Sequence, residues 1–435
     1  MSKDTIEMNG TTGANNAAEA NGTSAAGEMN EIKVIEGGVT AAKGFKAAGA
    51  YAGIGKNAEK GDLALVYSEV PGNAAAVYTK NKVKAAHIAV TKEHLQDGVA
   101  QAIICNSGNA NTCTPNGVEI AQKETELVAE ALGIKAADVL PAATGVIGVP
   151  LEITPFENTI PELAEKLSPE GSAQAADAIR TTDTYIKECA VTFELNGKTC
   201  TIGGIAKGSG MIHVNMGTML SFIGTDVKIS KELVQKALSD EILDSYNQVS
   251  VDGDTSTNDT VVVIANGLAG NEEITEPGED YKKFCDALHI VAVDLSQKIA
   301  GDGEGCEKLL EAHVTGAPDK DGARKVAKSV ICSSLFKAAV FASDANWGRI
   351  LCAIGYADCD FDASNIDVSV CSAAGTVEVC KGSASVPFDD DFATKVMSEK
   401  KVTVEIDLHD GDEEAYAWGC DLTYKYVEIN GSYRS

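Results

Sequence analysis

Alternation of hydrophobic and polar side chains marks three pairs of strands in this sequence. The clearest pair runs from Val191 to Leu195 and resumes from Cys200 to Ile202, after an Asn196-Gly197 dipeptide typical of two-residue hairpin turns. Two further pairs follow the same pattern: Ile366–Val370 with Thr376–Val379, and Val402–Leu408 with Ala415–Ile429 around His409–Asp412. The sequence therefore predicts a substantial share of antiparallel sheet.

Hydrophobic side chains at three- and four-residue steps predict helices elsewhere. They recur in this way from Tyr281 to Ile299, and Gly301 follows as a stop signal. The segments Ser230–Leu243 and Ser168–Ile179 look similar, the latter with Pro169 in its first turn. We therefore expect an α/β (α+β) chain built of layered sheets and helices, without an internal repeat.

The first thirty residues differ from everything that follows. Residues 1–30 contain no Leu, Val, Phe, Tyr or Trp and consist mainly of small and polar residues. Such a composition buries too little apolar surface to offset the entropy of ordering the chain, so we expect a disordered tail. The folded body is expected to begin near Ile32.

Length and charge narrow the class of protein. A chain of 435 residues has room for roughly two or three domains and a large core. Lysine and arginine number 36 against 64 aspartates and glutamates, which gives a formal net charge of −28. This charge repels phosphate backbones and anionic membrane surfaces, so neither nucleic acid nor membrane is an expected partner.

Several absences favour the cytoplasm. No apolar run approaches the length of about 18 residues that a membrane helix needs, and the amino terminus has no signal-peptide core. The 12 cysteines include no pair at the two-residue spacing of zinc knuckles or redox dithiols. We therefore expect reduced, buried packing thiols in a cytoplasmic protein.

Two loops resemble ligand sites only superficially. Val251–Thr260 alternates acidic and amide residues, but counted from Asp252 it lacks the Gly and Glu of a calcium-binding EF-hand. It is interpreted as a polar connection into the next strand, and no metal is expected. Gly301–Gly305 lacks the lysine of a phosphate-binding loop and is interpreted as a tight turn that presents Glu304.

The stretch Ile205–Phe222 is the most informative. It contains a single lysine, Lys207, among small and apolar residues, followed by Thr218 next to Gly217. One interpretation is a nearly dry pocket with one cation. The other is a glycine-rich loop that leads into a buried strand. Composition alone does not choose between them.

Seven motifs together resemble the ornithine acetyltransferase family, also called bifunctional glutamate N-acetyltransferase. The resemblance extends from about Ile32 to Ser435 and rests on the segments Asn106–Asn111, Ala143–Gly148, Thr181–Thr184, Lys207–Ile212, Asn215–Leu220, Val251–Asp259 and Asn430–Ser435. It implies two units of layered sheets and helices, similar in active-site logic to amino-terminal-nucleophile hydrolases.

The resemblance also implies that the chain cuts itself between Gly217 and Thr218. The products would be an α chain of residues 31–217 and a β chain of residues 218–435. The family usually has Ala where this chain has Gly217, and glycine widens the backbone conformations available at the bond. Cleavage would free the α-amino group of Thr218, whose pKa of about 7.7–8.0 suits it to act as general base for its own hydroxyl.

Roles for further residues follow from the same resemblance. Thr144 and Gly145 would form the oxyanion hole, and Lys207 would bind the substrate carboxylate. Thr182 would contact substrate, although Thr181 matches the motif equally well. Glu304 would receive the ornithine amine, and Asn430 and Ser435 would close the pocket; many relatives end in Thr rather than Ser.

The implied reaction is acetyl transfer from N2-acetyl-L-ornithine to L-glutamate through an acetyl-threonine, without a cofactor. No residue distinguishes relatives that also use acetyl-CoA from those that only recycle acetyl groups. The implied assembly is a heterotetramer of two α and two β chains. The alternatives are a self-processing amidase or aminopeptidase of similar architecture and a protein that merely binds a small amino acid.

Overall fold

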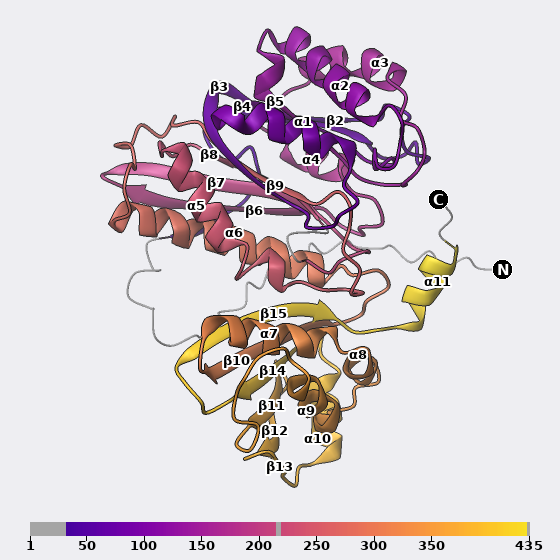
Figure 1. Ribbon diagram of the computed structural model, residues 1–435, viewed down its shortest axis with the longest axis vertical. Coiled ribbons are helices and arrows are strands. Elements are labelled where there is room, and N and C mark those ends of the chain that lie inside the picture. The colour runs from indigo at the N-terminus through magenta and orange to yellow at the C-terminus, as the bar shows by residue number, and fades with distance from the viewer. Residues whose placement is uncertain (1–31, 215–218, 433–435) are drawn as a thin grey trace, which may run out of the picture. The chain divides into compact units, whose positions relative to one another are not determined.

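Two β-sheets with helices packed against them make up the described part of the chain (Figure 1). The computed structural model describes residues 32–214 and 219–432, so the predicted tail of residues 1–30 lies outside it. The first strand begins at Lys33, close to the expected start of the folded body. The prediction of an α/β chain with layered sheets and helices is confirmed.

The larger sheet has nine strands in the order β1-β6-β7-β8-β9-β3-β4-β5, and β2 pairs with β3 beside this path. The pairs β4/β5 and β8/β9 are parallel, and the others are antiparallel. Its strands are β1 Lys33–Ile35, β2 Phe45–Ala50, β3 Leu63–Tyr78, β4 Val99–Asn106, β5 Val139–Ala143, β6 Lys187–Leu195, β7 Lys198–Lys207, β8 Leu220–Thr225 and β9 Thr260–Ala265.

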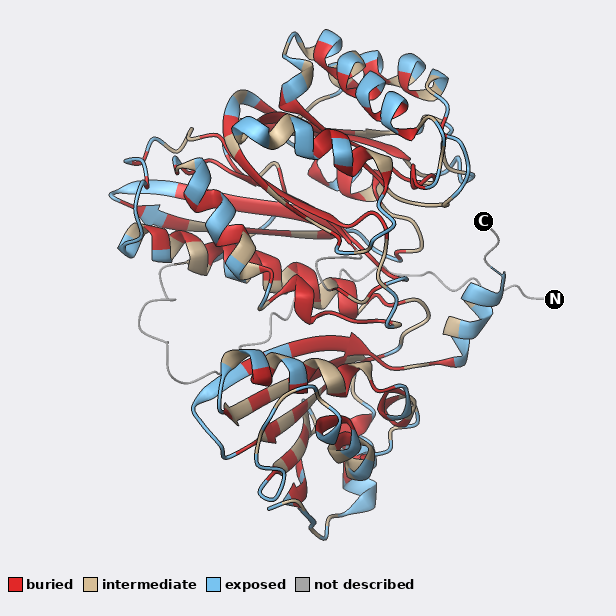
Figure 2. Cartoon of the chain, in the orientation of Figure 1, coloured by how far each residue is buried: buried red, intermediate tan, exposed pale blue. Residues whose placement is uncertain are grey.

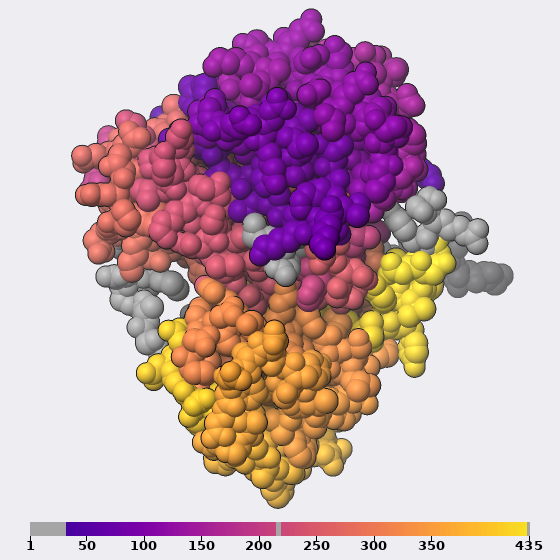
Figure 3. Space-filling view, in the orientation of Figure 1, coloured from indigo at the N-terminus to yellow at the C-terminus, as the bar shows by residue number. Residues whose placement is uncertain are grey.

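The smaller sheet has six strands in the order β13-β12-β11-β14-β10-β15. In the space-filling view its part of the chain forms the orange surface, and the first half of the chain forms the indigo and magenta surface (Figure 3). Its strands are β10 Leu309–Ala317, β11 Asp367–Ser372, β12 Gly375–Lys381, β13 Ala384–Ser385, β14 Lys401–Asp407 and β15 Glu413–Cys420.

Helices connect the strands of both sheets. The α-helices are α1 Ala86–His94, α2 Gly117–Leu132, α3 Thr154–Glu165, α4 Ser172–Ala178, α5 Lys231–Glu241, α6 Glu279–Ala300, α7 Lys320–Cys332, α8 Ser334–Phe341, α9 Trp347–Gly355, α10 Asp390–Met397 and α11 Tyr424–Ser432. Short 3₁₀ turns lie at Leu95–Asp97, Ala136–Asp138 and Tyr246–Gln248.

The central strands of the nine-stranded sheet are buried on both faces. Alternate residues of β9 belong to two different apolar clusters: Val261 and Val263 pack with α5 and α6, whereas Val262 and Ile264 pack with α4. The central strands of this sheet are coloured as buried in Figure 2, whereas β1 and the turn end of β6 and β7 are exposed; the exposed surfaces of the helices face outward. Burial on both faces explains why β8 and β9 have continuous apolar runs.

The strongest predictions from periodicity are confirmed. β6 and β7 form the predicted hairpin, with Leu195 opposite Lys198 across Asn196-Gly197. The helix predicted from Tyr281 to Ile299 is α6, and it ends at Gly301. The helix predicted from Ser230 is α5, where the Ser230 side chain caps the helix by accepting from the Leu233 N–H.

Two predictions are wrong for a shared reason. The helix expected from Ser168 begins only at Ser172, because Ser168 exchanges backbone hydrogen bonds with Ala47; Pro169 therefore precedes the helix. The strands expected to pair around His409–Asp412 do not pair, because β10 lies between β14 and β15. The second of these strands ends at Cys420, and the residues that follow include α11. In both cases a partner distant in sequence overrides the local pattern.

The hairpin expected from Ile366–Val370 and Thr376–Val379 is confirmed as β11 and β12. All 12 cysteines are free thiols: five are buried, five are partly buried, and Cys113 and Cys352 are exposed, so the expected burial is wrong for these two and incomplete for the partly buried five. Among the helices of the described residues, none has both the length and the apolar character needed to cross a membrane.

Candidate active site

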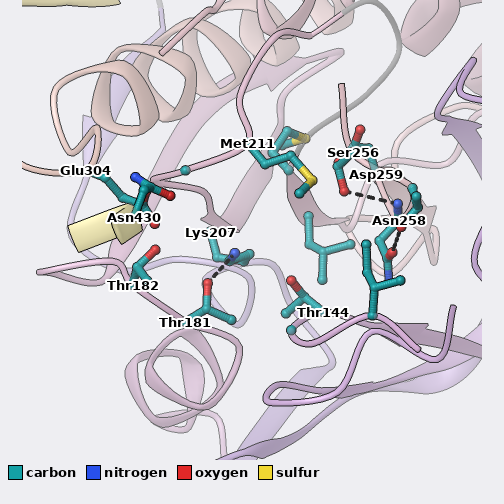
Figure 4. Close-up of a pocket in the computed structure, with 16 residues that line it drawn as sticks. Thr144, Thr181, Thr182, Lys207, Met211, Ser256, Asn258, Asp259, Glu304 and Asn430 are labelled. Atoms are coloured by element: carbon teal, nitrogen blue, oxygen red, sulfur yellow. Dashed lines mark hydrogen bonds between the residues drawn. The ribbon is translucent and has the colours of Figure 1, made fainter. Parts of the chain in front are cut away.

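A pocket of about 170 Å³ lies where several strands of the nine-stranded sheet begin or end (Figure 4). Thr144 and Gly145 directly follow β5, Lys207 ends β7, and Leu220 begins β8. Met219 and Asp259, which precede β8 and β9, line it as well. The complete lining is Thr144, Gly145, Ile147, Thr181, Thr182, Lys207, Gly210, Met211, Met219, Leu220, Ser256, Thr257, Asn258, Asp259, Glu304 and Asn430.

Six predicted site residues are brought together in this pocket: Thr144, Gly145, Thr182, Lys207, Glu304 and Asn430. Gly217, Thr218 and Ser435 lie outside the described residues, and so does the bond expected to be cut. Met219 immediately follows Thr218 in the sequence and lines the pocket. Both interpretations of Ile205–Phe222 therefore hold in part. This glycine-rich stretch leads into the buried strand β8, and it also contributes Lys207 to a pocket.

Lys207 is a buried cation held from two sides. Its Nζ donates to Thr181 Oγ1 at 2.7 Å and lies 3.8 Å from Asp183 Oδ2. Figure 4 shows the contact between Lys207 and Thr181. Thr182 lies between Thr181 and the pair formed by Glu304 and Asn430. Both threonines line the pocket, so Thr181 positions the lysine and Thr182 leaves its side chain facing the cavity.

A buried ion-pair network lies behind Lys207. Lys187 Nζ donates to Asp183 Oδ1 at 2.8 Å and to Asp302 Oδ2 at 2.6 Å, and the side chains of Lys187 and Asp183 are 0% exposed. Burial works to raise the pKa of Asp183, but the Lys207 and Lys187 ammonium groups outweigh it and hold that pKa well below its usual range. Asp183 therefore stays a carboxylate between two lysines.

The same network ties together three segments that line the pocket. Asp183 Oδ1 accepts from the Gly208 N–H at 2.6 Å, next to Lys207. The Asp302 carbonyl accepts from Ser209 Oγ at 2.7 Å, and the Ser209 carbonyl accepts from the Glu304 N–H at 3.0 Å. Lys207 and Glu304 are thus positioned relative to each other through buried hydrogen bonds.

Sequence reasoning missed Lys187, Asp183 and Asp302 as members of the site. The available signal was the alternation along the strand, which places Lys187 on the same face as the apolar Cys189 and Val191. An unpaired buried lysine is costly, so such a position predicts carboxylate partners, but it does not identify them.

Glu304 and Asn430 form the far side of the pocket. Asn430, on α11, donates its Nδ2–H to Glu304 Oε2 at 2.8 Å. A Cβ atom on Gly210 would collide with the Glu304 carboxylate, so a larger residue at position 210 would displace that carboxylate from its place beside the loop. The tight turn predicted at Gly301–Gly305 does present Glu304, and it presents it to the pocket.

Thr144 and Gly145 lie at the sharp turn after β5. The Thr144 N–H donates to the Asn106 carbonyl at 2.9 Å, which fixes the backbone so that the Thr144 side chain lines the pocket. Gly145 has φ +134°, and a Cβ atom there would overlap the backbone of Gly108. Glycine is therefore needed both for the conformation and for the close packing of two loops.

Asp259 is a buried acid on the opposite wall. Burial raises the pKa of its carboxyl group well above the usual value, and Oδ2 has no hydrogen-bond partner among the described residues. The neighbouring Asn258 Nδ2–H groups donate to the carbonyls of Ala110 at 2.6 Å and Ala143 at 2.8 Å. Asn258 therefore links this wall to the end of β5.

The loop that resembles a calcium site leads into β9, as interpreted from the sequence. The Asp252 carboxylate accepts from the N–H groups of Met211 at 2.7 Å and Ile212 at 2.8 Å, so it orders the stretch that follows Lys207. Within residues 32–214 and 219–432, no group of three or more His, Cys, Asp or Glu side chains is arranged to hold a metal ion. What the sequence did not predict is that residues 256–259 of this loop line the pocket.

The matching family model and the most similar relatives name one family. The ArgJ family matches residues 46–435. A Symbiobacterium thermophilum protein called arginine biosynthesis bifunctional protein ArgJ is 50% identical over 403 residues, which cover 92% of this chain and 99% of that protein. A Caldanaerobacter subterraneus protein of the same name is 47% identical over 405 residues, 93% of this chain and 100% of its own.

Among solved structures, the arginine biosynthesis bifunctional protein argJ of Bacillus halodurans shares 44% identity with a TM-score of 0.47. The match covers 50% of this chain and 100% of that one. The ornithine acetyltransferase of Mycobacterium tuberculosis, solved in complex with ornithine, shares 38% identity with a TM-score of 0.38 and covers 41% of this chain and 96% of its own.

Proposed function

The chain belongs to the ArgJ family, and from that premise we propose that it transfers an acetyl group from N2-acetyl-L-ornithine to L-glutamate in arginine biosynthesis. The observation that carries the proposal is the gathering of six residues, singled out by sequence, around one pocket. These residues are spread over nearly 290 positions, from Thr144 to Asn430, so their meeting is not a local effect. The products are ornithine and N-acetylglutamate.

The proposed nucleophile is Thr218, freed by cleavage of the Gly217–Thr218 bond. Its hydroxyl oxygen attacks the acetyl carbonyl, its own α-amino group takes the proton, and ornithine leaves with that proton on its amine. The amine of glutamate then attacks the acetyl-threonine and restores the hydroxyl. Thr144 and Gly145, at the turn after β5, are the proposed donors to the oxyanion of both tetrahedral intermediates.

The charges of the pocket suit the amino-acid part of the substrates. The Lys207 ammonium, held by Thr181, is the proposed partner of the α-carboxylate. The Glu304 carboxylate, on the other side of Thr182, is the proposed partner of the side-chain amine of ornithine. Asn430 holds Glu304, and we propose that Ser435 closes the pocket from the same carboxy-terminal segment.

The position of the proposed cut has a structural consequence. β7 and β8 are antiparallel neighbours, with Lys207 opposite Leu220, and the bond between residues 217 and 218 lies in their connection. Both proposed chains therefore contribute strands to the same nine-stranded sheet.

The proposed assembly is a heterotetramer of two α and two β chains. The proposed location is the cytoplasm, because 12 free thiols suit a reducing compartment.

Mass spectrometry and a product assay test the proposal together. The purified protein should contain a fragment that begins at Thr218, and carbon-13 acetyl-labelled acetylornithine should transfer its label to glutamate. Thr218→Ala should remain a single chain of 45.2 kDa and lose transfer, because the nucleophile is absent. A chain that stays intact yet transfers acetyl at full rate would contradict the mechanism. Free acetate as the main product at saturating glutamate would favour the amidase.

A further inference from the structure

Two thiols are in contact beside the turn that presents Glu304. Cys306 directly follows this turn, and Cys420 is the last residue of β15. Their thiols are hydrogen-bonded to each other. Cys420 is 2% exposed, whereas Cys306 is only partly buried, so one sulfur of the pair is accessible to a small molecule. The pair therefore combines the proximity that a disulfide requires with access for an oxidant.

The backbone around the two sulfurs is tightly packed. A Cβ atom on Gly303 would lie 2.7 Å from Cys420 Sγ, so this sulfur packs directly against the turn. The Cys306 N–H donates to the Gly303 carbonyl at 2.9 Å, and Cys306 Sγ lies 3.1 Å from the Gly301 carbonyl oxygen. Both sulfurs therefore contact the backbone of the same short turn, and a change in the distance between them has to move that turn.

The surroundings of Cys420 favour its thiolate, which is the reactive form of a cysteine. Lys337 Nζ, on α8, lies 3.6 Å from Cys420 Sγ and also donates to the Cys420 carbonyl. The hydrogen bond with the Cys306 thiol lowers the pKa of Cys420 most, and the Lys337 ammonium lowers it further. Burial and the Asp421 carboxylate work in the opposite direction without outweighing them. Cys420 is therefore suited to attack the more accessible Cys306.

The turn between the thiols and the pocket has little freedom to move independently. Asn430, on α11, donates its Nδ2–H to Glu304 Oε2 at 2.8 Å. The Gly305 carbonyl accepts from Thr423 Oγ1 at 2.6 Å, and a Cβ atom on Gly305 would lie 2.7 Å from a side-chain atom of α11. The turn is thus packed against the segment that follows β15. A displacement of the Cys306 end therefore passes to Glu304 instead of being absorbed by the loop.

We propose that Cys306 and Cys420 form a reversible disulfide, a redox modification site that displaces Glu304 in the pocket. The inference rests on the proposed function, in which Glu304 binds the side-chain amine of ornithine. A disulfide bond is about 2.05 Å long, shorter than any hydrogen bond between two thiols. Its formation pulls the turn toward the end of β15 and changes the spacing between Glu304 and Lys207. The oxidised enzyme therefore binds acetylornithine less well than the reduced enzyme.

The oxidant is a low-molecular-weight disulfide of the glutathione type, and the exchange with it balances. Cys306 Sγ forms a bond to one sulfur of the small disulfide, whose own S–S bond breaks and releases one small thiol. Cys420 Sγ then attacks Cys306 Sγ, and the second small thiol leaves. The two protein thiols lose two electrons and two protons, which the small disulfide gains as it becomes two thiols. An excess of small thiol reverses the exchange, as suits a transient disulfide in a reducing compartment.

Mass spectrometry in redox buffers tests the bond itself. The purified protein is equilibrated with mixtures of reduced and oxidised glutathione, quenched with acid, alkylated at its free thiols and digested. We expect the peptides that contain Cys306 and Cys420 to be joined under oxidising conditions and to separate after treatment with dithiothreitol. Cys352→Ser, which removes an exposed thiol, is the control and should form the same cross-link. If oxidised glutathione modifies the exposed Cys113 and Cys352 while the proposed pair stays free, the inference is wrong.

Steady-state kinetics test the effect on Glu304. Oxidation should raise KM for acetylornithine several-fold and change KM for glutamate less, because glutamate has no side-chain amine to pair with Glu304. Cys306→Ser keeps a hydroxyl beside the Gly301 carbonyl but cannot form the disulfide, so its KM should not respond to oxidised glutathione.

Two outcomes would overturn the inference: a cross-linked enzyme whose KM for acetylornithine is unchanged, or an equal rise of KM in oxidised Cys306→Ser. The proposed function fails in a different way. An enzyme that forms the cross-link but transfers no acetyl group even when reduced would contradict the proposed function and would still support the disulfide site.

Discussion

The central strands of the nine-stranded sheet are buried on both faces, whereas β11 and β14 of the six-stranded sheet are buried on one. Every residue of β8 and β9 is buried, but buried and more exposed residues alternate along β14. The doubly covered sheet is also the one whose strand ends form the candidate active site. Enclosure on both faces supplies a nearly dry environment, in which charges act over short distances with little screening.

The two regions also treat buried charge differently. Beside the nine-stranded sheet, Lys187, Asp183 and Asp302 form a network whose three members are almost completely buried. In the six-stranded sheet, buried Glu311 pairs with Lys401, a lysine that is half exposed. Charge in the first region is isolated from water and has to be satisfied internally. Variants in the two regions should therefore differ in how much they lower the free energy of unfolding and in whether they also lower the rate of transfer.

Removing Lys187 should have the largest effect. Lys187→Met leaves the carboxylates of Asp183 and Asp302 buried without their shared partner, which should lower the free energy of unfolding by about 3–5 kcal/mol. Denaturant unfolding measures this. Lys46→Met, which breaks the exposed ion pair with Glu69, is the control and should leave the midpoint unmoved. Equal effects of the two variants would contradict the claim that a buried ion-pair network costs more to break than an exposed ion pair.

Removing Lys207 should have the next largest effect, and more on turnover than on folding, because Asp183 keeps Lys187 as a partner at 2.8 Å. Lys207→Ala removes the proposed charge-assisted contact to the substrate carboxylate, so kcat/KM should fall roughly 30-fold, which corresponds to about 2 kcal/mol. Steady-state kinetics measure the loss, and gel analysis should still find much of the self-cleavage. If transfer is unchanged at subsaturating acetylornithine, Lys207 does not bind substrate.

A core change in the six-stranded sheet should affect stability alone. Ile406→Val on β14 removes one buried methylene group and should lower the free energy of unfolding by about 1 kcal/mol. The reaction rate should not change, because this sheet contributes no described residue to the candidate site. Unfolding and transfer are measured on the same preparation. A loss of transfer larger than the loss of stability would show that the two regions are coupled.

The smallest effect is expected from His313 on β10, and it should depend on pH. Burial works to lower the pKa of His313, but hydrogen bonds with Glu405 and Glu414 outweigh it and raise that pKa. Protonated His313 therefore stabilises the fold below the unfolded value of about 6.5, and this stabilisation is lost as pH rises through the folded value. His313→Gln should lower the free energy of unfolding by less than about 1 kcal/mol at acidic pH, and this loss should become smaller at alkaline pH. Unfolding of both proteins across this range measures it. A difference that grows with pH would be the wrong sign.

Local patterns in the sequence predicted elements whose partners are close in the chain. The hairpin of β6 and β7 turns at the expected Asn196-Gly197, and α6 ends at the expected Gly301. The errors occurred where a distant segment intervened. Ala47 forms backbone hydrogen bonds with Ser168, so α4 begins later than expected, and β10 separates β14 from β15. No window of neighbouring residues contains that information.

The sequence also predicted only part of the candidate site: the residues in motifs, but not the residues that position them. Motifs singled out Lys207, Glu304 and Asn430, and these residues line one pocket. The residues that position them were not found, because a lysine such as Lys187 at a strand end looks like a surface residue until its carboxylate partners are known. Asp259 was read as part of a polar connection, since its burial depends on strands from three parts of the chain.

The pairing of β7 with β8 has a consequence for how the mature enzyme regains its structure. If the chain is cut as proposed, in the connection between these strands, complete unfolding would release two separate polypeptides, each with only part of the nine-stranded sheet. Renaturation then begins with a collision between unlike fragments, so its rate should rise with protein concentration. The uncut precursor should recover in a step whose half-time is independent of dilution.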